Sequence, residues 1–291
     1  MKVITLDQEF LGTRHAIASF LVEGPAGYIL VESGPATTQD TLERKVREVG
    51  VEPKDIQNVL VTHIHLDHSG GAGYWARRGA KVYVHPKGAR HLIDPARLLA
   101  SAKRIYQDQM DTLWGQTLPI DAEKVVEFSE PKLTIAGLEV EALDTPGHAT
   151  HHLAYRIGDS VFTGDVAGCR LTGSKFVSVP APPPEFNLET WLQSLQRLRE
   201  QKASRLYLTH FGEVSDVDFH LDQLESRLAL CVDFVKAHQE TPAEELAALY
   251  QAWDRTQARE WDVDDLTYSA YERANPSFMS AQGITRYLSK L

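Results

Sequence analysis

The stretch VLVTHIHLDHSGGAGYW, residues 59–75, places four chemically active side chains directly after an apolar run. Three histidines and one aspartate stand within six positions, and two glycines follow them. Side chains two apart in an extended segment point the same way, so His63 and His65 can bind one ion together. Asp67 and His68 come where the chain turns toward a helix and can face elsewhere. This spacing suits a centre of two metal ions better than one closed structural site.

Three further polar residues each follow an apolar strand of their own. His148 ends the segment LDTPGH, Asp165 ends FTGD and His210 ends LYLTH. Loops at strand ends are where a rigid scaffold can gather distant side chains. Together, five histidines and two aspartates supply nitrogen and oxygen ligands that suit zinc, with iron or manganese as alternatives.

The segments around these motifs alternate between strand and helix patterns. Strands are expected at 2–6, 16–22, 27–32, 58–63, 81–85, 133–148, 152–165 and 205–210. Helices are expected at 69–79 and 188–201, and the chain reads as helical from about residue 215 onward. This order predicts an α/β fold in which helices cover sheet.

Residues 94–118 form a predicted helical insertion with two alternative roles. Tyr106, Met110 and Trp114 recur near the helical period, which indicates a single stripe. The simpler interpretation is a helix that packs this stripe into the core. The alternative is a helical cap over a pocket, in which the aromatic residues meet substrate and Tyr106 brings a phenol over the metals.

Composition narrows the classes of partner. The chain has 291 residues, 43% of them hydrophobic, and a formal net charge of −10, which argues against a nucleic-acid partner. No signal peptide is apparent, no run approaches the roughly 20 apolar residues of a membrane helix, and two cysteines make no disulfide framework. We therefore expect a cytoplasmic protein with a small-molecule substrate and no membrane partner. A homodimer stays an open alternative.

The segments THIHLDH, TPGH, TGD and LTH, in this order and spacing, resemble the metallo-β-lactamase superfamily. The resemblance implies a four-layer αββα sandwich as a catalytic domain at 1–212, followed by a helical C-terminal extension at 213–291. It also implies a first metal on His63, His65 and His148, a second on Asp67, His68 and His210, and Asp165 bridging the two.

Two such cations would lower the pKa of a shared water toward neutrality, and the metal-bound hydroxide would attack a carbonyl polarised by one metal. Asp67 is the predicted catalytic residue, which orients the water and passes a proton to the leaving group. The expected function is a dinuclear metal-dependent hydrolase of a small thioester, ester or lactone. The helical tail is similar to that of hydroxyacylglutathione hydrolases, which also append helices there.

Four departures from the family pattern refine this expectation. Glu32-Ser33-Gly34 stands where many relatives have Asp-x-Gly, so Glu32 or Ser33 is the candidate support for a ligand. Asp165 argues against a true β-lactamase, and His65 replaces the glutamate of the family's oxygen-reducing iron proteins. Gly168 stands where the family's quorum-signal lactonases have a tyrosine. A phosphodiesterase or nuclease of the same superfamily, and a di-iron oxidoreductase, are the alternative functions.

Other polar residues near the motifs receive structural interpretations. His151 and His152 are interpreted as a polar pair at a strand start, the alternative being contact with a ligand or with substrate. His85 is interpreted as structural or as a residue of the pocket edge. Cys169 is interpreted as a small buried side chain.

Overall fold

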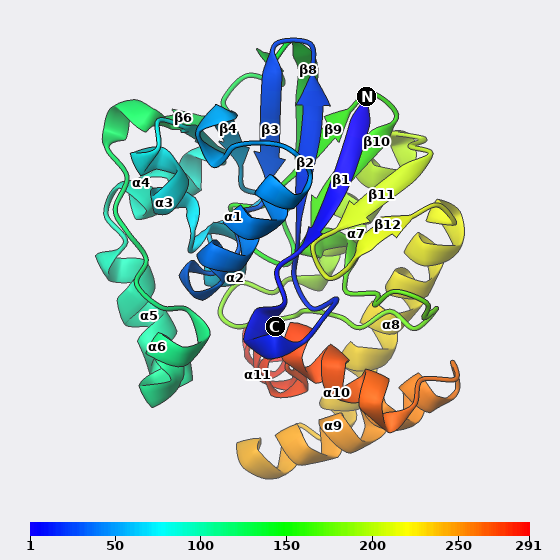
Figure 1. Cartoon of the computed structure of the whole chain (residues 1–291). Coiled ribbons are helices and arrows are strands. Elements are labelled where there is room, and N and C mark those ends of the chain that lie inside the picture. Colours follow the sequence, from blue (N-terminus) through cyan, green and yellow to red (C-terminus); the bar gives the residue numbers. More distant parts are fainter.

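The computed structural model describes residues 1–291, and its strands form two six-stranded mixed sheets (Figure 1). The first sheet has the order β1-β2-β3-β4-β5-β6, with β1 Lys2–Asp7, β2 Ala18–Gly24, β3 Gly27–Val31, β4 Ile56–Leu60, β5 Lys81–Val84 and β6 Val125–Glu127. Its first three strands are antiparallel, and pairing from β3 to β6 is parallel.

The second sheet has the order β12-β11-β10-β9-β8-β7. Its strands are β7 Lys132–Ile135, β8 Leu138–Asp144, β9 Leu153–Ile157, β10 Ser160–Gly164, β11 Arg205–Leu208 and β12 Gly212–Val214. All of its pairs are antiparallel except β10 with β11. Ala136 and Gly137 both have positive φ, 50° and 77°, which makes the hairpin turn between β7 and β8.

Helices cover the outer face of each sheet. On the first sheet lie α1 Gln39–Glu48, α3 Ala72–Arg77 and α4 Pro86–Ile93, and on the second lie α7 Leu188–Glu200 and α8 Val217–Ala237. The short helix α2 Leu66–Ser69 lies beyond the end of β4. The four-layer αββα sandwich expected from the sequence is confirmed.

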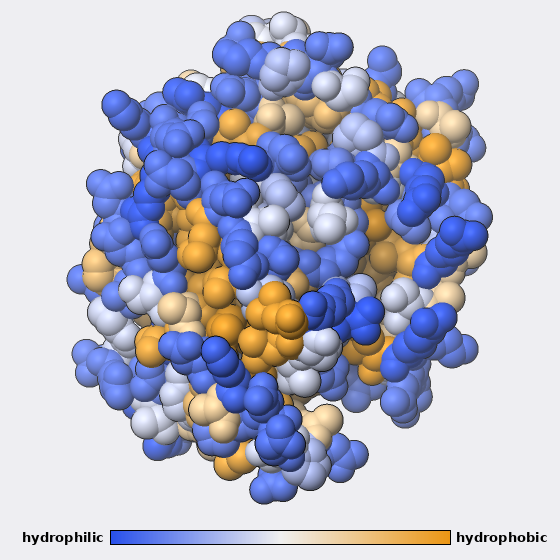
Figure 2. All heavy atoms as spheres, turned by 180° about the vertical axis from the view of Figure 1, so that it is seen from behind, coloured by the Kyte–Doolittle hydropathy of each residue, from blue (hydrophilic) through white to orange (hydrophobic).

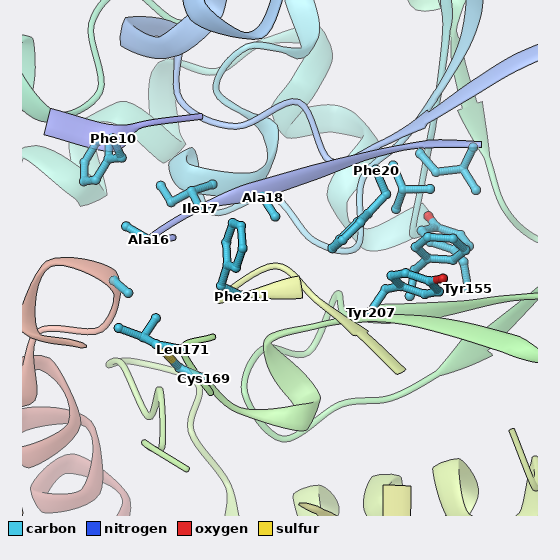
Figure 3. Packing of buried hydrophobic residues seen from close by; sticks show 14 of the residues in the cluster. Phe10, Ala16, Ile17, Ala18, Phe20, Tyr155, Cys169, Leu171, Tyr207 and Phe211 are labelled. Atoms are coloured by element: carbon cyan, nitrogen blue, oxygen red, sulfur yellow. The ribbon is translucent and has the colours of Figure 1, made fainter. Parts of the chain in front are cut away.

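An aromatic core fills the space between the two sheets. Phe20 of β2 lies 5.5 Å from Phe162 of β10, and Phe162 stacks on Tyr207 of β11 at 5.0 Å, measured between ring centroids. Figure 3 shows Phe20 above Tyr155 and Tyr207 in this layer. The core anchors the strand ends from which the candidate site is built.

The insertion between β5 and β6 differs from the single helical stripe expected. Helix α5 Ala96–Tyr106 ends at Gln107, whose φ is 48°. A short turn follows over Gln107–Gln109, and helix α6 Met110–Leu113 comes after it. The left-handed residue ends the helix, so the expected stripe is wrong. The change of direction brings Trp114 back against Tyr106, with ring centroids 5.0 Å apart.

The C-terminal helices are α8, α9 Ala243–Arg259, α10 Asp265–Ala274 and α11 Ser277–Leu288, in the lower part of Figure 1. Leu221 and Leu224 of α8 and Ile284 of α11 share one apolar cluster with Leu206 and Leu208 of β11. The division at 212/213 stays a prediction, and β12, which ends at Val214, crosses it.

The surface carries few large apolar side chains. Figure 2 shows the face opposite to that of Figure 1, with apolar residues gathered in its lower central part and hydrophilic residues around them. None of the helices combines the length and the apolar character needed to cross a bilayer.

Candidate metal centre

The seven candidate ligands lie at one end of the two sheets. They come from the segments that follow β4, β8, β10 and β11 and from α2, and they are His63, His65, Asp67, His68, His148, Asp165 and His210. Six of them form two trios whose ligand atoms lie within 4.8 Å of one another. Residues that are far apart in the chain therefore meet, because the strands that carry them end at the same edge.

The first trio consists of His63, His65 and His148. Nε2 of His63 lies 2.9 Å from Nδ1 of His65, and Nε2 of His148 lies 3.1 and 2.9 Å from these two atoms. Three nitrogens on a tetrahedral zinc ion would be roughly 3.3 Å apart, given zinc–nitrogen bonds of about 2.0–2.1 Å. The three nitrogens thus lie close to, and slightly below, the spacing that a cation of this size requires.

The second trio consists of Asp67, His68 and His210. Oδ2 of Asp67 lies 3.5 Å from Nε2 of both rings. Asp165 lies between the trios, with Oδ2 at 3.3 Å from Nε2 of His148 and Oδ1 at 3.2 and 3.4 Å from Nε2 of His68 and His210. One carboxylate thus offers one oxygen to each trio, which is the arrangement that a bridging ligand needs.

Two buried atoms at this point show that a cation would fit. Nε2 of His68 and Oδ1 of Asp165 are buried, lie 3.2 Å apart and make no well-aligned hydrogen bond. A buried polar atom without a partner is unfavourable by roughly 1–3 kcal/mol. A divalent cation between them would satisfy both atoms, and nitrogen and oxygen donors are the chemistry that zinc accepts.

Backbone carbonyls fix which nitrogen of two rings faces the centre. Nδ1 of His148 donates to the carbonyl of Pro180 and Nδ1 of His210 donates to the carbonyl of Ala16, both at 2.7 Å. Because a carbonyl only accepts, Nδ1 carries the proton in each ring and Nε2 faces the other ligands. This is the arrangement in which a neutral ring presents a lone pair to a metal.

Glu32 contacts the side chain of His68, and Ser33 contacts its backbone carbonyl. Oε1 of Glu32 lies 3.1 Å from Nδ1 of His68 and accepts from the hydroxyls of Thr62 and Thr209 at 2.5 and 3.3 Å. The Ser33 hydroxyl donates to the carbonyl of His68 at 2.9 Å. Glu32 is fully buried with a φ of 65°, a strained backbone that these contacts hold in place.

Burial keeps the first trio free of protons. Burial, followed by the neighbouring His68 ring, lowers the pKa of His63 well below its ordinary value. Burial and the adjacent His148 lower the pKa of His65 to about 3. Burial also outweighs the Asp165 charge and lowers the pKa of His148. These rings are therefore neutral at pH 7 and ready to bind a cation.

The two histidines of the second trio have raised pKa values, in contrast to those of the first trio. Burial lowers the pKa of His68, but the carboxylates of Asp165 and Asp67 outweigh it and raise that pKa well above its ordinary value. The same balance raises the pKa of His210. A metal at the second trio would therefore displace protons, whereas a metal at the first would not.

His152 contacts the bridging candidate Asp165, in line with the alternative weighed for the pair His151 and His152, contact with a ligand. Its Nε2 accepts from the backbone N–H of Asp165 at 3.3 Å, and its Nδ1 lies 2.9 Å from the hydroxyl of Thr145. His151 instead lines the cavity, with Nε2 at 3.4 Å from Oε2 of Glu185. The pair of adjacent histidines gave no signal that separates these two environments.

A cavity of about 260 Å³ opens beside the ligands. Its walls come from α5, the proline-rich loop at 180–184 and the link between α10 and α11. Trp114 lines the cavity and also stacks on Phe10 in the core at 5.7 Å, so it combines both roles weighed for the insertion. Tyr106 lines the cavity too, and burial, then the Asp67 charge, raises the pKa of its phenol.

Gly168 stands where the family's quorum-signal lactonases have a tyrosine, and its surroundings leave no room for that side chain. Gly168 has a φ of 74°, and a side chain there would meet Leu224 and the carbonyl of Ser178 at 3.0 Å. Cys169 is buried outside the cavity lining. His85 caps α4 by accepting from the backbone N–H of Lys87 at 3.0 Å, in line with a structural role.

Comparison with known proteins gives consistent results. The family model of the metallo-beta-lactamase superfamily matches residues 12–210. A metallo-beta-lactamase fold-containing protein of Sulfurisphaera tokodaii is 30% identical over 176 residues, which are 58% of this chain and 66% of that protein. The hydroxyacylglutathione hydrolase of Shewanella baltica strain OS223 is 29% identical over 169 residues, 57% of this chain and 52% of that enzyme. The chain thus spans about half to two thirds of these curated relatives.

Among solved structures, a metallo-beta-lactamase family protein from Thermus thermophilus superimposes with a TM-score of 0.73. The match covers 99% of this chain and 93% of that one, at 22% sequence identity. At this identity the likeness is one of fold, and it includes the C-terminal helices.

Proposed function

The chain belongs to the metallo-beta-lactamase superfamily, and we propose that it is a hydrolase that holds two divalent metal ions, zinc first among the candidates, and cleaves a thioester, ester or lactone. The observation that carries this proposal is the pair of ligand trios on either side of Asp165. The similarity to a hydroxyacylglutathione hydrolase supports thioesters as the first substrates to test.

When bound, two such cations lower the pKa of a water molecule between them and polarise an oxygen of the substrate. The protein's part is to hold the substrate bond beside the ligands, exclude bulk water and move a proton. The cavity of about 260 Å³ is close to the lower end of the range for small-molecule pockets, roughly 300–1,000 Å³.

Asp67 is the residue proposed to move the proton. It lines the cavity, and its side chain is 20% exposed, whereas Asp165 is 5% exposed. Burial raises the pKa of Asp67, but His68 and His210 lower it well below its ordinary value. Its carboxylate is therefore ionised at neutral pH, and in this form it can accept a hydrogen bond from water, orient it and relay its proton to the leaving group.

Tyr106 is proposed to orient the substrate. It lines the cavity on the α5 side, edge-on to Trp114, and its raised pKa keeps the phenol protonated at neutral pH. A protonated phenol can donate a hydrogen bond to a substrate oxygen, and such a bond strengthens as negative charge develops there.

Metal content and a substrate panel together test the proposal. We expect elemental analysis of the purified protein to find about two ions per chain, as two ligand sets imply. His148→Ala and His210→Ala form a matched pair, each of which should lose the ion of its own trio. One ion per chain, unchanged by added zinc or manganese, would contradict the dinuclear centre. Turnover of bis(p-nitrophenyl) phosphate above that of esters, thioesters and lactones would favour the phosphodiesterase.

A further inference from the structure

We propose that the substrate is an anionic amphiphile, whose apolar group occupies the chamber beside the ligands and whose negative group pairs with Arg97 at the rim. The chamber is the part of the cavity between the α5–Trp114 wall and the α10–α11 wall. This inference rests on the proposed function, because it places the substrate against the candidate metal centre.

Apolar side chains form both walls of the chamber. Leu98, Ile105 and Trp114 line it from the insertion. On the opposite side it is lined by the proline-rich loop and by Pro276 and Met279 of the C-terminal helices. Met279 is only 7% exposed, so its side chain is already packed in place. Such walls favour an apolar group over a hydrated one by the area that each buries.

Hydrogen bonds fix the C-terminal wall to the second half of the chain. The amide of Asn275 donates to the hydroxyl of Ser178 at 2.8 Å, and the hydroxyl of Ser280 donates to the carbonyl of Val179 at 2.6 Å. The phenol of Tyr271 donates to the carbonyl of Phe176 at 2.7 Å. These bonds hold the segment that leads into the proline-rich loop, so this wall is formed before any ligand arrives.

The insertion wall is held by equivalent contacts with the N-terminal half. The hydroxyl of Thr37 donates to the carbonyl of Leu113 at 2.8 Å, and the backbone N–H of Ala36 donates to the carbonyl of Trp114 at 3.1 Å. Two walls anchored to different parts of the chain define the width of the chamber. A preformed chamber of this kind discriminates ligands by the size of their apolar group.

Arg97 is the charged residue of the rim that has no protein partner. Glu185 accepts from the backbone N–H and the hydroxyl of Thr150, both at 3.0 Å, and lies 3.4 Å from Nε2 of His151. Arg97 lines the same cavity, is exposed, and takes part in no ion pair or hydrogen bond of the structure. In a chain with a net charge of −10, an unpaired guanidinium at the mouth is a local attraction for an anion.

Beside Arg97 lie a second basic residue, Arg90, and the acidic Asp94 and Glu185, all of which act on His91. Arg90 donates from Nε to Nε2 of the neighbouring His91 at 3.2 Å, and His91 also lines the cavity. The C-terminal wall adds Ala274, Asn275, Pro276 and Met279, none of which is charged. The negative group of the substrate therefore belongs at the α4–α5 rim, and its apolar group belongs between the walls.

Binding of alkanesulfonates to the metal-loaded protein tests both halves of the proposal without relying on turnover. Butane-, hexane- and octanesulfonate would be titrated calorimetrically, with 1-octanol as the uncharged match for the longest. We expect affinity to rise about fourfold per methylene until the chamber is full, as burial of each methylene implies. Met279→Phe should stop this rise at a shorter chain, and Met279→Ala should shift it to a longer one.

Arg97→Gln tests the anion, with Arg104→Gln as its matched control on the same helix. Arg104 is exposed and does not line the cavity. We expect Arg97→Gln to weaken octanesulfonate about fivefold, as loss of an exposed ion pair implies, and to leave 1-octanol unchanged. Arg104→Gln should change neither. Equal effects of the two substitutions would overturn the pairing with Arg97.

Affinity that does not depend on chain length would overturn the apolar chamber. Turnover of short esters, measured on the same preparations, separates the two proposals. Chain-length-dependent binding without any ester or thioester turnover would reject the hydrolase and leave the chamber. Turnover without chain-length-dependent binding would support the hydrolase and reject the apolar chamber.

Discussion

The protein buries polar side chains in two places, at the ends of its sheets and between α8 and α9. In the second place a cation meets an anion. Arg227 donates to Asp254, which also accepts from the phenol of Tyr268 at 3.1 Å, and the guanidinium lies 4.9 Å from the ring centroids of Phe176 and Trp253. At the sheet ends, by contrast, ring nitrogens and carboxylate oxygens of seven residues converge beside a cavity, with no arginine or lysine among the seven.

This difference separates a structural cluster from a functional one. Arg227 and Asp254 are both nearly buried and their opposite charges meet, although Nε of Arg227 makes no hydrogen bond. Nε2 of His68 and Oδ1 of Asp165 are equally buried and make no well-aligned hydrogen bond. Burial of charge is therefore common to both clusters, and only convergence of acceptors beside a cavity points to a ligand.

The largest expected effect concerns Asp67→Asn. The amide cannot accept the proton that the proposed reaction moves, so we expect kcat to fall by roughly 10²–10⁴. The near-isosteric change should leave the fold intact, which circular dichroism would check, and kcat would be compared per metal-loaded chain because Asp67 is also a candidate ligand. If the variant kept both ions and near-normal kcat, Asp67 would not be the proton carrier. The cluster at the sheet ends would then not differ from the Arg227 cluster in the way proposed.

Arg227→Met should show the opposite pattern. Removing the guanidinium leaves the Asp254 carboxylate buried without its cation, which is expected to destabilise the fold by about 3–5 kcal/mol. Turnover per folded, metal-loaded chain should be unchanged. Chemical denaturation would measure the loss, with Arg259→Met as control. The ion pair of Arg259 with Asp265 is 58% and 65% exposed, so its loss should lower stability by less than about 1 kcal/mol.

The pH dependence of stability should also originate in the structural cluster. Burial outweighs Arg227 and raises the pKa of Asp254 from 3.8 to about 6. The folded protein therefore binds this proton more tightly than the unfolded chain does. The resulting stabilisation is complete below pH 3.8 and is lost as the pH rises through 6. It amounts to about 3 kcal/mol, at about 1.4 kcal/mol per pKa unit.

Unfolding of the wild type and of Asp254→Asn between pH 4 and pH 7 would measure this effect. The asparagine does not titrate, and titration of the metal ligands is common to both proteins and cancels in the difference. We expect the wild type to lose stability relative to the variant as the pH rises. A difference that stays flat or grows with pH would show that Asp254 is ionised throughout.

The smallest expected effect concerns Tyr106→Phe. Loss of one hydrogen bond to the substrate should lower kcat about three- to tenfold, the value of a bond worth roughly 0.5–1.5 kcal/mol. Metal content and melting temperature should stay unchanged, because no protein partner of the hydroxyl is lost. A large drop in melting temperature would show instead that Tyr106 is a core residue.

Local patterns in the sequence indicated where strands end and which polar residues follow them, whereas the αββα fold was predicted from the family resemblance. His63 and His65 stand two apart at the end of an apolar strand, and His148 and His210 follow strands of their own. Once the strands were recognised, the common edge of the sheets brought these loops together. The assignment of the ligands to two trios, with Asp165 between them, came from the family resemblance and not from these local patterns.

What escaped prediction depends on contacts between distant segments. Gln107 ends α5 in a left-handed conformation that no glycine or proline announces, so the stripe through Trp114 was misjudged. The wall contributed by Met279 arises only after α10 and α11 have packed against the body of the protein.

The strained Glu32 has a further consequence for how the molecule is held together. Its carboxylate receives hydroxyls from Thr62, beyond the end of β4, and from Thr209, beyond the end of β11, so it joins the two sheets. An ion on His68 would strengthen this junction, because its other ligands come from segments that follow strands of both sheets. Such an ion acts as a reversible cross-link between the two halves of the chain. Folding and metal loading then form one linked equilibrium, in which free metal at a hundred times its Kd adds about 2.7 kcal/mol of stability and a chelator removes it.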